Sequence, residues 1–188
     1  MTLDPFFDEF HRRQPDVRVV LLPPTAPQET PPPAVPVDAV TAAARATRAR
    51  QAARGHLESL WVTAAPDRPV PADVRYQWEA GDVPGTVRAT ASGRHDGAVA
   101  DLRGDLTVAR DRLLAEGWTV QARPVGPGGA RLLATLDEVN LEVVVWGPEG
   151  PWDVTVSATA VVGEHSLAVR TTGATVTPWD TPAPQVEL

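Results

Sequence analysis

The 188-residue sequence lacks cysteine, lysine and isoleucine, and it contains a single tyrosine. Without cysteine there is no disulfide framework, no thiolate zinc site and no thiol nucleophile. Without lysine, and with one phenol, few groups are available for acid–base catalysis. These absences disfavour an enzyme, and the sequence predicts no cofactor.

Long apolar runs are also missing, since no stretch approaches the roughly 20 apolar residues of a membrane-spanning helix. The N-terminus does not have the unbroken apolar run of a secretory signal, because Asp4, Asp8 and Glu9 interrupt it. The formal net charge of -7 disfavours non-specific attraction to nucleic acid and to anionic membranes. We therefore expect a cytoplasmic protein that binds neither nucleic acid nor membrane.

The aromatic residues that are present begin with a cluster in the first ten positions: Phe6, Phe7 and Phe10. Asp4 followed by Pro5 is typical of a helix N-terminus. The three rings then share one face, because residues three and four apart are neighbours on a helix. A short strand over 17–22 is expected to follow, so residues 1–22 form a helix-strand arm.

Residues 23–37 contain seven prolines and little that could build a core. A proline-rich segment of this length is extended and spans roughly 45 Å. The sequence therefore divides into four parts: an arm (1–22), a Pro-rich linker (23–37), an α+β domain (38–170) and a C-terminal strand with a proline-containing tail (171–188).

Asp38 can cap a helix over 38–61, in which alanines recur along one stripe. Four arginines flank that stripe: Arg45, Arg48, Arg50 and Arg54. A nucleic-acid-binding helix would gather them on one face, so their position on both sides is typical of solvated side chains. Nucleic-acid binding through this helix is therefore the least favoured function considered.

A second helix is predicted over 97–116, and most of the remaining segments alternate apolar and polar residues as strands do. The helix carries an apolar stripe of Val99, Leu102, Leu106, Ala109 and Leu113. The predicted strands cover 74–78, 85–94, 118–125, 130–136, 141–146 and 152–162, with a further short strand over 167–172. Tight turns make the sheet antiparallel. The sequence thus predicts an α+β fold, with about five to six main strands and helix 97–116 across one face.

Residues 113–160 end a helix at Gly117 and Trp118, pass through two tight hairpins and close with the strand "WDVTVSATA". In these features the segment resembles β-α-β-β-β modules of uncharacterised actinobacterial proteins. The exclusive use of arginine also matches a high-GC genome of that kind. The resemblance implies a fold, and no functional residue follows from it.

The polar residues show no catalytic or metal-binding pattern. His56 and Glu58 have the H-x-E spacing of zinc deaminases, which also need a cysteine pair. Gly126, Gly128 and Gly129 lie between two predicted strands, whereas a phosphate-binding loop precedes a helix. No serine lies in the glycine-flanked elbow of a hydrolase. We predict no catalytic, cofactor-binding or metal-binding residue.

The leading hypothesis is a non-catalytic protein that binds another protein or its own copy, as in a homodimer. The predicted partner-binding residues are the apolar side chains of the arm: Phe6, Phe7, Phe10, Val17, Val19 and Leu21. The arm can pack on its own domain or on another chain, and both remain open.

The alternative hypothesis is a small-ligand-binding protein or enzyme that uses a cleft between sheet and helices. Its candidate residues are Tyr76, Trp78, Trp146 and Trp152. Trp146 and Trp152 flank the turn 147–151, and they would form an aromatic cross-strand pair if they opposed each other directly.

Overall fold

The computed structural model describes residues 36–188 apart from 65–68, 97–101, 127 and 148–149, and these described residues belong to one compact unit, 33–188. The predicted arm (1–22) and nearly all of the predicted linker lie outside them. The helices are α2 (Ala39–Ala64), α3 (Leu102–Ala115) and α4 (Ser166–Thr171), with a 3₁₀ turn η1 (Gly163–His165) before α4. The strands are β1 (Asp73–Ala80), β2 (Thr86–His95), β3 (Thr119–Val125), β4 (Gly129–Leu136), β5 (Val139–Val145), β6 (Trp152–Val161) and β7 (Thr175–Pro178).

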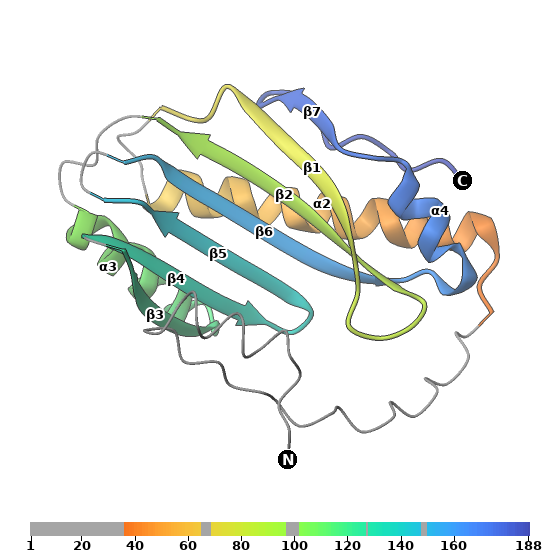
Figure 1. Ribbon diagram of the computed structural model, residues 1–188, viewed down its shortest axis with the longest axis horizontal. Coiled ribbons are helices and arrows are strands. Elements are labelled where there is room, and N and C mark those ends of the chain that lie inside the picture. The colour runs from red at the N-terminus through yellow and green to blue at the C-terminus, as the bar shows by residue number, and fades with distance from the viewer. Residues whose placement is uncertain (1–35, 65–68, 97–101, 127, 148–149) are drawn as a thin grey trace, which may run out of the picture. The chain divides into compact units, whose positions relative to one another are not determined.

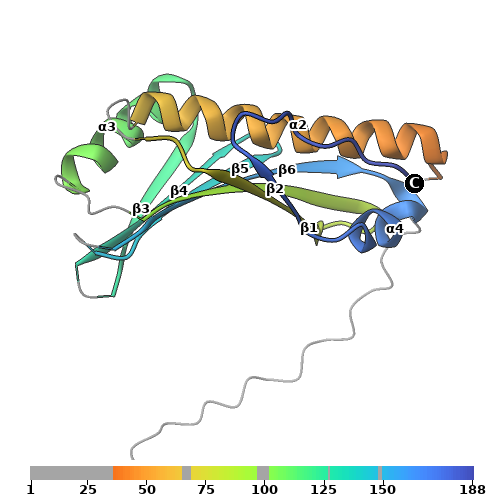
Figure 2. The same cartoon turned by 90° about the horizontal axis from the view of Figure 1, so that it is seen from above.

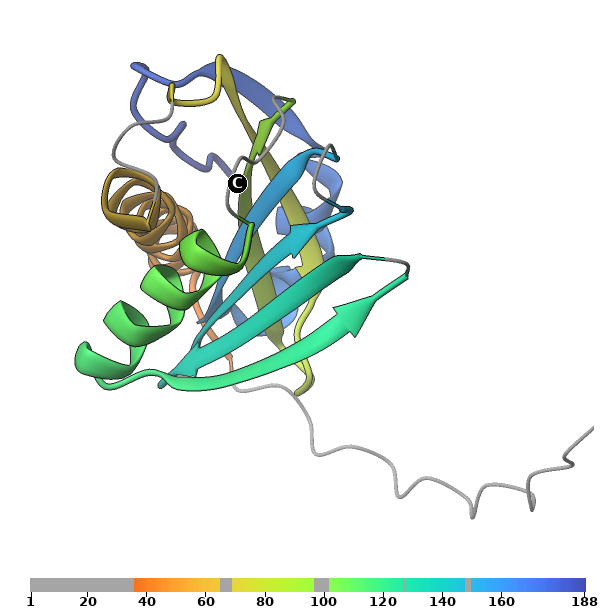
Figure 3. The ribbon, with the colours of Figure 1, turned by 90° about the vertical axis from the view of Figure 1, so that its left-hand side faces the viewer.

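Within the described residues, seven strands form one antiparallel sheet in the order β3-β4-β5-β6-β2-β1-β7 (Figure 1). Helix α2 runs along the sheet (Figure 2) and packs mainly on β6 and β2. Helix α3 covers the same face (Figure 3). The predicted α+β class is confirmed, with one or two more strands than expected.

The start of α2 follows directly from the sequence. The backbone N–H of Thr41 donates to Asp38 Oδ1 at 2.9 Å, which is an N-cap. A hydrogen bond from the Thr41 side chain, and then this backbone hydrogen bond, lower the pKa of the Asp38 carboxyl below its ordinary value. The alanine stripe, represented by Ala42, Ala46 and Ala53, is fully buried. Its small side chains allow the helix to approach the sheet closely.

The alternation in β6 is also as predicted. Trp152, Val154 and Val156 are buried under the helices, whereas Asp153 and Thr155 face the other side of the sheet. This alternation with a period of two is typical of a strand that has the core on one side and solvent on the other.

The predicted short strand over 167–172 is wrong, because this segment forms α4. Gly163, with φ of 61°, begins a turn that leads from β6 through η1 into the helix. Val169 is the buried residue of α4. Strand preference is a weak and context-dependent signal, and here the turn after β6 directs the segment into a helix instead.

The conditional pairing of Trp146 with Trp152 is also wrong. Trp152 pairs with Val145, and the N–H of Trp146 donates to the Pro151 carbonyl. Because neighbouring positions of a strand point to opposite faces, Trp152 is buried under the helices while Trp146 is 58 % exposed.

The packing of α3 gives a direct test of the fold. Leu113→Ala is expected to lower the free energy of unfolding by about 2–5 kcal/mol, as truncation in a packed core does. Leu113 is 2 % exposed, whereas Leu106 is only partly buried against the core, so Leu106→Ala should cost less. Urea unfolding followed by tryptophan fluorescence measures both variants. Equal losses would contradict this placement of α3.

Candidate functional site

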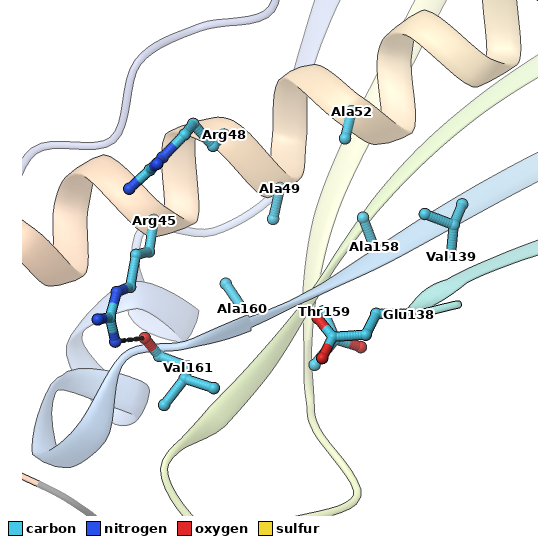
Figure 4. Close-up of a pocket in the computed structure, with 10 residues that line it drawn as sticks. All are labelled: Arg45, Arg48, Ala49, Ala52, Glu138, Val139, Ala158, Thr159, Ala160 and Val161. Atoms are coloured by element: carbon cyan, nitrogen blue, oxygen red, sulfur yellow. Dashed lines mark hydrogen bonds between the residues drawn. The ribbon is translucent and has the colours of Figure 1, made fainter. Parts of the chain in front are cut away.

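A groove of about 630 Å³ lies between α2 and β6, and it is here called the α2–β6 groove (Figure 4). Helix α2 contributes Arg45, Arg48, Ala49 and Ala52. The sheet side consists of Glu138, Val139, Ala158, Thr159, Ala160 and Val161. The lining is therefore mostly apolar and built from small side chains, with Thr159 as a polar member and with charged residues at its ends.

The groove exists because two neighbouring strands end at different places. Strand β5 begins at Val139, which pairs with Ala158, whereas β6 continues to Val161. Next to this pair, the N–H of Thr159 donates to the Glu138 carbonyl at 3.3 Å. Beyond it, no described strand covers this edge of β6.

The charges of the groove lie at opposite ends (Figure 4). Arg45 Nη1 donates to the Val161 carbonyl at 3.2 Å, and Arg48 Nε donates to the Ala44 carbonyl at 3.4 Å. In the described part of the chain, neither of these exposed arginines has a carboxylate partner, and Glu138 forms no ion pair there. One end of the groove thus favours an anionic group and the other a cationic group.

The other two arginines of α2 lie in a different environment from the one predicted. Arg50 and Arg54 are 4 % and 5 % exposed, so they are not solvated side chains. The guanidinium carbon of Arg50 lies 4.8 Å from the centre of the Trp78 ring, and Arg50 Nη1 donates to the Pro184 carbonyl at 3.1 Å. Burial lowers the pKa of Arg50 below its ordinary value. Because both guanidinium groups are enclosed, they cannot neutralise phosphates on a nucleic acid.

Arg54 holds the C-terminal segment against α2. Its guanidinium carbon lies 4.6 Å from the centre of the Trp179 ring, and its Nη2 donates to the Trp179 carbonyl. Its Nη1 donates to the Tyr76 hydroxyl at 3.4 Å. Further along the segment, the N–H of Val186 donates to Thr47 Oγ1 at 3.0 Å. The segment 171–188, predicted as a C-terminal strand with a proline-containing tail, contributes β7 to the sheet and buries Val186 in the core.

The four aromatic residues of the predicted ligand cleft lie on two faces of the sheet. Tyr76 and Trp152 are buried under the helices and Trp78 is partly buried there. Trp146 lies on the opposite face, where its Nε1 donates to Asp153 Oδ2 at 2.9 Å. The structure does not bring the four together around one cavity.

That opposite face carries a second groove, of about 530 Å³. It is lined by side chains of mixed charge, among them Asp73, Arg75, Arg94, Glu142 and Asp153. Arg94 pairs with Asp96 and Asp153, whereas the Arg75 guanidinium has no partner among the described residues. The alternation of apolar and polar residues in the strands predicts this polar face. Its charged side chains can be there only because the face is exposed to solvent.

The point where the linker joins the domain is fixed by two adjacent side chains. The N–H of Val37 donates to Glu164 Oε2 at 3.2 Å, and His165 Nε2 donates to the Val37 carbonyl at 2.9 Å. Backbone N–H groups of Glu164 itself and of Val37 lower the pKa of the Glu164 carboxyl. The predicted partner-binding residues, Phe6 to Leu21, lie outside the described residues.

Neither a metal site nor a known relative identifies the function of this region. Among the described residues, no three His, Asp or Glu side chains gather in a way that could hold a metal ion. None of the described helices is long and apolar enough to cross a membrane. The chain matches no family model, no curated protein and no solved structure.

Proposed function

We propose that the chain is a non-catalytic cytoplasmic protein for protein–protein interaction or assembly, and that its binding site is the α2–β6 groove. The proposed partner is an apolar segment of another protein or of a second copy. The observation that carries this proposal is a mostly apolar groove whose charged residues, Arg45, Arg48 and Glu138, form no ion pair with any described residue.

The groove suits a protein segment better than a small molecule. Sites for small ligands enclose most of the ligand and direct a few polar groups inward. Here the lining is mostly alanine and valine, Thr159 lies beside Glu138, and the arginines lie at the other end. An amphipathic helix presents the complementary arrangement, with an apolar stripe and charges beside it.

The alternative, binding of a small ligand, would use the second groove, on the opposite face of the sheet. Arg75 has no described partner there, and Trp146 offers an exposed ring in the same groove. An anionic aromatic compound would match both groups. Paired and solvated charges dominate this groove, however, so it supports the alternative less strongly than the α2–β6 groove supports a protein partner.

The test fills the groove without disturbing the core. Ala52 is exposed and lines the groove, whereas Ala44 is exposed on the same helix outside it. In affinity capture from the host lysate, quantified by mass spectrometry, Ala52→Arg should reduce recovery of a specific partner or of an untagged copy by at least about tenfold, which corresponds to about 1.4 kcal/mol of binding. The full-length wild type and Ala44→Arg should retain it.

Equal recovery with all three proteins would contradict the proposed site. A small molecule that co-purifies with the protein and is lost on replacing Arg75, but not on replacing Ala52, would favour the ligand-binding alternative. Circular dichroism controls for folding.

A further inference from the structure

The face of the sheet opposite α2 and α3 carries a further groove of about 330 Å³, here called the Ser157 groove. Its floor crosses three neighbouring strands, because Thr90 of β2 pairs with Ser157 of β6, and Ser157 pairs with Asn140 of β5. Thr155 lies on the same side of β6, two residues before Ser157, and all four side chains line the groove. Neighbouring strands are about 4.8 Å apart. The floor therefore presents uncharged polar groups at a regular spacing.

The buried serine is the observation that points to a ligand. Ser157 is 7 % exposed, yet its hydroxyl makes no hydrogen bond to any described residue, and it lines the groove. The amide of Asn140 and the hydroxyl of Thr155 also have no hydrogen-bond partner in the described part of the chain. Thr90, 8 % exposed, donates only to the Gln77 carbonyl, at 3.4 Å, and its oxygen can still accept. Because buried polar side chains are nearly always hydrogen-bonded, these groups are available to a bound molecule.

The charged groups of the Ser157 groove, by contrast, are already paired. Three carboxylates and one arginine line it: Glu79, Asp82, Glu142 and Arg88. Asp82 Oδ2 and Glu79 Oε2 lie 2.8 and 3.6 Å from nitrogens of Arg88. Glu142 Oε1 lies 2.6 Å from Arg131 Nε. An anionic ligand would meet an excess of carboxylates, and a cationic one would have to compete with two arginines for them.

We propose that the Ser157 groove binds a neutral, polyhydroxylated small molecule of the size of a hexose. Hydroxyl and amide groups both donate and accept hydrogen bonds, and so they match ligand hydroxyls, which do the same. Leu133 also lines the groove and is half-buried, which gives the C–H face of a sugar ring an apolar contact. The volume of about 330 Å³ lies at the lower end of the range for small-molecule sites, about 300–1,000 Å³.

This site is separate from the α2–β6 groove. The two share no lining residue, and they lie on opposite faces of the sheet. A ligand of the Ser157 groove would therefore bind without displacing a protein partner from α2.

A chemical-shift titration of the isotope-labelled full-length chain with D-glucose, D-galactose and D-mannose, one at a time, tests the site. At least one of these hexoses should give saturable shifts of the backbone amides around Thr90, Asn140 and Ser157. The expected Kd is in the millimolar range, because each hydrogen bond to the ligand replaces one to water and contributes little net free energy. Glucosamine and glucuronate, a cationic and an anionic relative of glucose, should bind more weakly than the neutral hexose.

Two variants remove the proposed contacts one at a time. Ser157→Val should weaken hexose binding by at least about fivefold, because a ligand hydroxyl loses its partner. Asn140→Ala, at an exposed position of the same floor, should weaken it by about threefold, and it serves as the test if Ser157→Val impairs folding. Thr135→Val is the matched control, because Thr135 is exposed and pairs with Asn140 but does not line the groove. This control and Ala52→Arg should both bind the hexose as the wild type does.

If none of the three hexoses gives saturable shifts up to about 100 mM, which corresponds to negligible affinity, the proposal is overturned. Tighter binding of glucosamine than of every neutral hexose would make the groove a cation site and would also overturn it. Binding that survives both Ser157→Val and Asn140→Ala, or shifts centred on α2, would do the same. Each of these results would leave capture of a protein partner through Ala52 unaffected, so this proposal and the proposed function can fail independently.

Discussion

Replacing Arg54 with alanine is expected to lower the free energy of unfolding by about 2–4 kcal/mol, although arginine is usually a surface residue. The Arg54 side chain is 6 % exposed, and the Tyr76 hydroxyl and the Trp179 carbonyl both accept from it. Its removal leaves these acceptors without their donor, and each buried unsatisfied group costs about 1–3 kcal/mol. The contact with the Trp179 ring is also lost, at about 0.5–2 kcal/mol.

The ion pair with Glu58 contributes little to this effect. Although Arg54 Nε lies 2.7 Å from Glu58 Oε1, the Glu58 side chain is 48 % exposed. Pairs of this kind on a helix are worth about 0.2–0.5 kcal/mol. Glu58→Gln should therefore be nearly neutral, and this separates the buried contacts from the surface pair.

Urea unfolding, followed by tryptophan fluorescence, measures the loss. Arg48→Ala is the matched control, because Arg48 is exposed on the same helix and its Nε bonds only to the helix backbone. It should change stability by less than about 0.5 kcal/mol, as ordinary surface substitutions do. If Arg54→Ala unfolds at the same urea concentration as Arg48→Ala, the enclosed guanidinium is not a structural element.

Deleting residues 179–188 should have a still larger effect. Trp179 lies 5.9 Å from the Trp61 ring, centre to centre, and Val186 is 7 % exposed. Removing a largely buried tryptophan and a buried valine forfeits about 4–7 kcal/mol. This is comparable with the whole stability of a typical domain, about 5–15 kcal/mol.

We expect the melting temperature of the deletion variant to fall by about 10–25 °C, given about 2–4 °C per kcal/mol for a chain of this size. Differential scanning calorimetry gives the measurement. Deleting only Glu187 and Leu188, both exposed, is the control and should leave the melting temperature nearly unchanged. If removal of all ten residues changed the melting temperature only slightly, the C-terminal segment would not be needed for the stability of the domain.

The position of the helices and strands was largely predictable from local pattern. Alternation in β6 fixed which side chains face the core, and Asp38 marked the start of α2. These features depend only on residues a few positions apart, so they can be seen in the sequence without the tertiary structure. The same patterns were sufficient for the α+β class.

The burial of Arg50 and Arg54, by contrast, was decided by the tertiary structure. Each donates to an acceptor far away in the sequence. Arg50 and its acceptor Pro184 are 134 residues apart, and Arg54 and its acceptor Trp179 are 125 residues apart. On the helix alone, both positions look like solvated arginines beside an alanine stripe. Only the C-terminal segment, laid over α2, encloses them.

The candidate site divides in the same way. The sequence by itself predicts an N-terminal arm with three phenylalanines as the partner-binding element, and this arm lies outside the described residues. The groove became visible only in the folded sheet, because β5 begins opposite Ala158 while β6 continues to Val161 against β2. Where a strand ends depends on which strand pairs with it and in which register, and alternation within one segment carries no information about that.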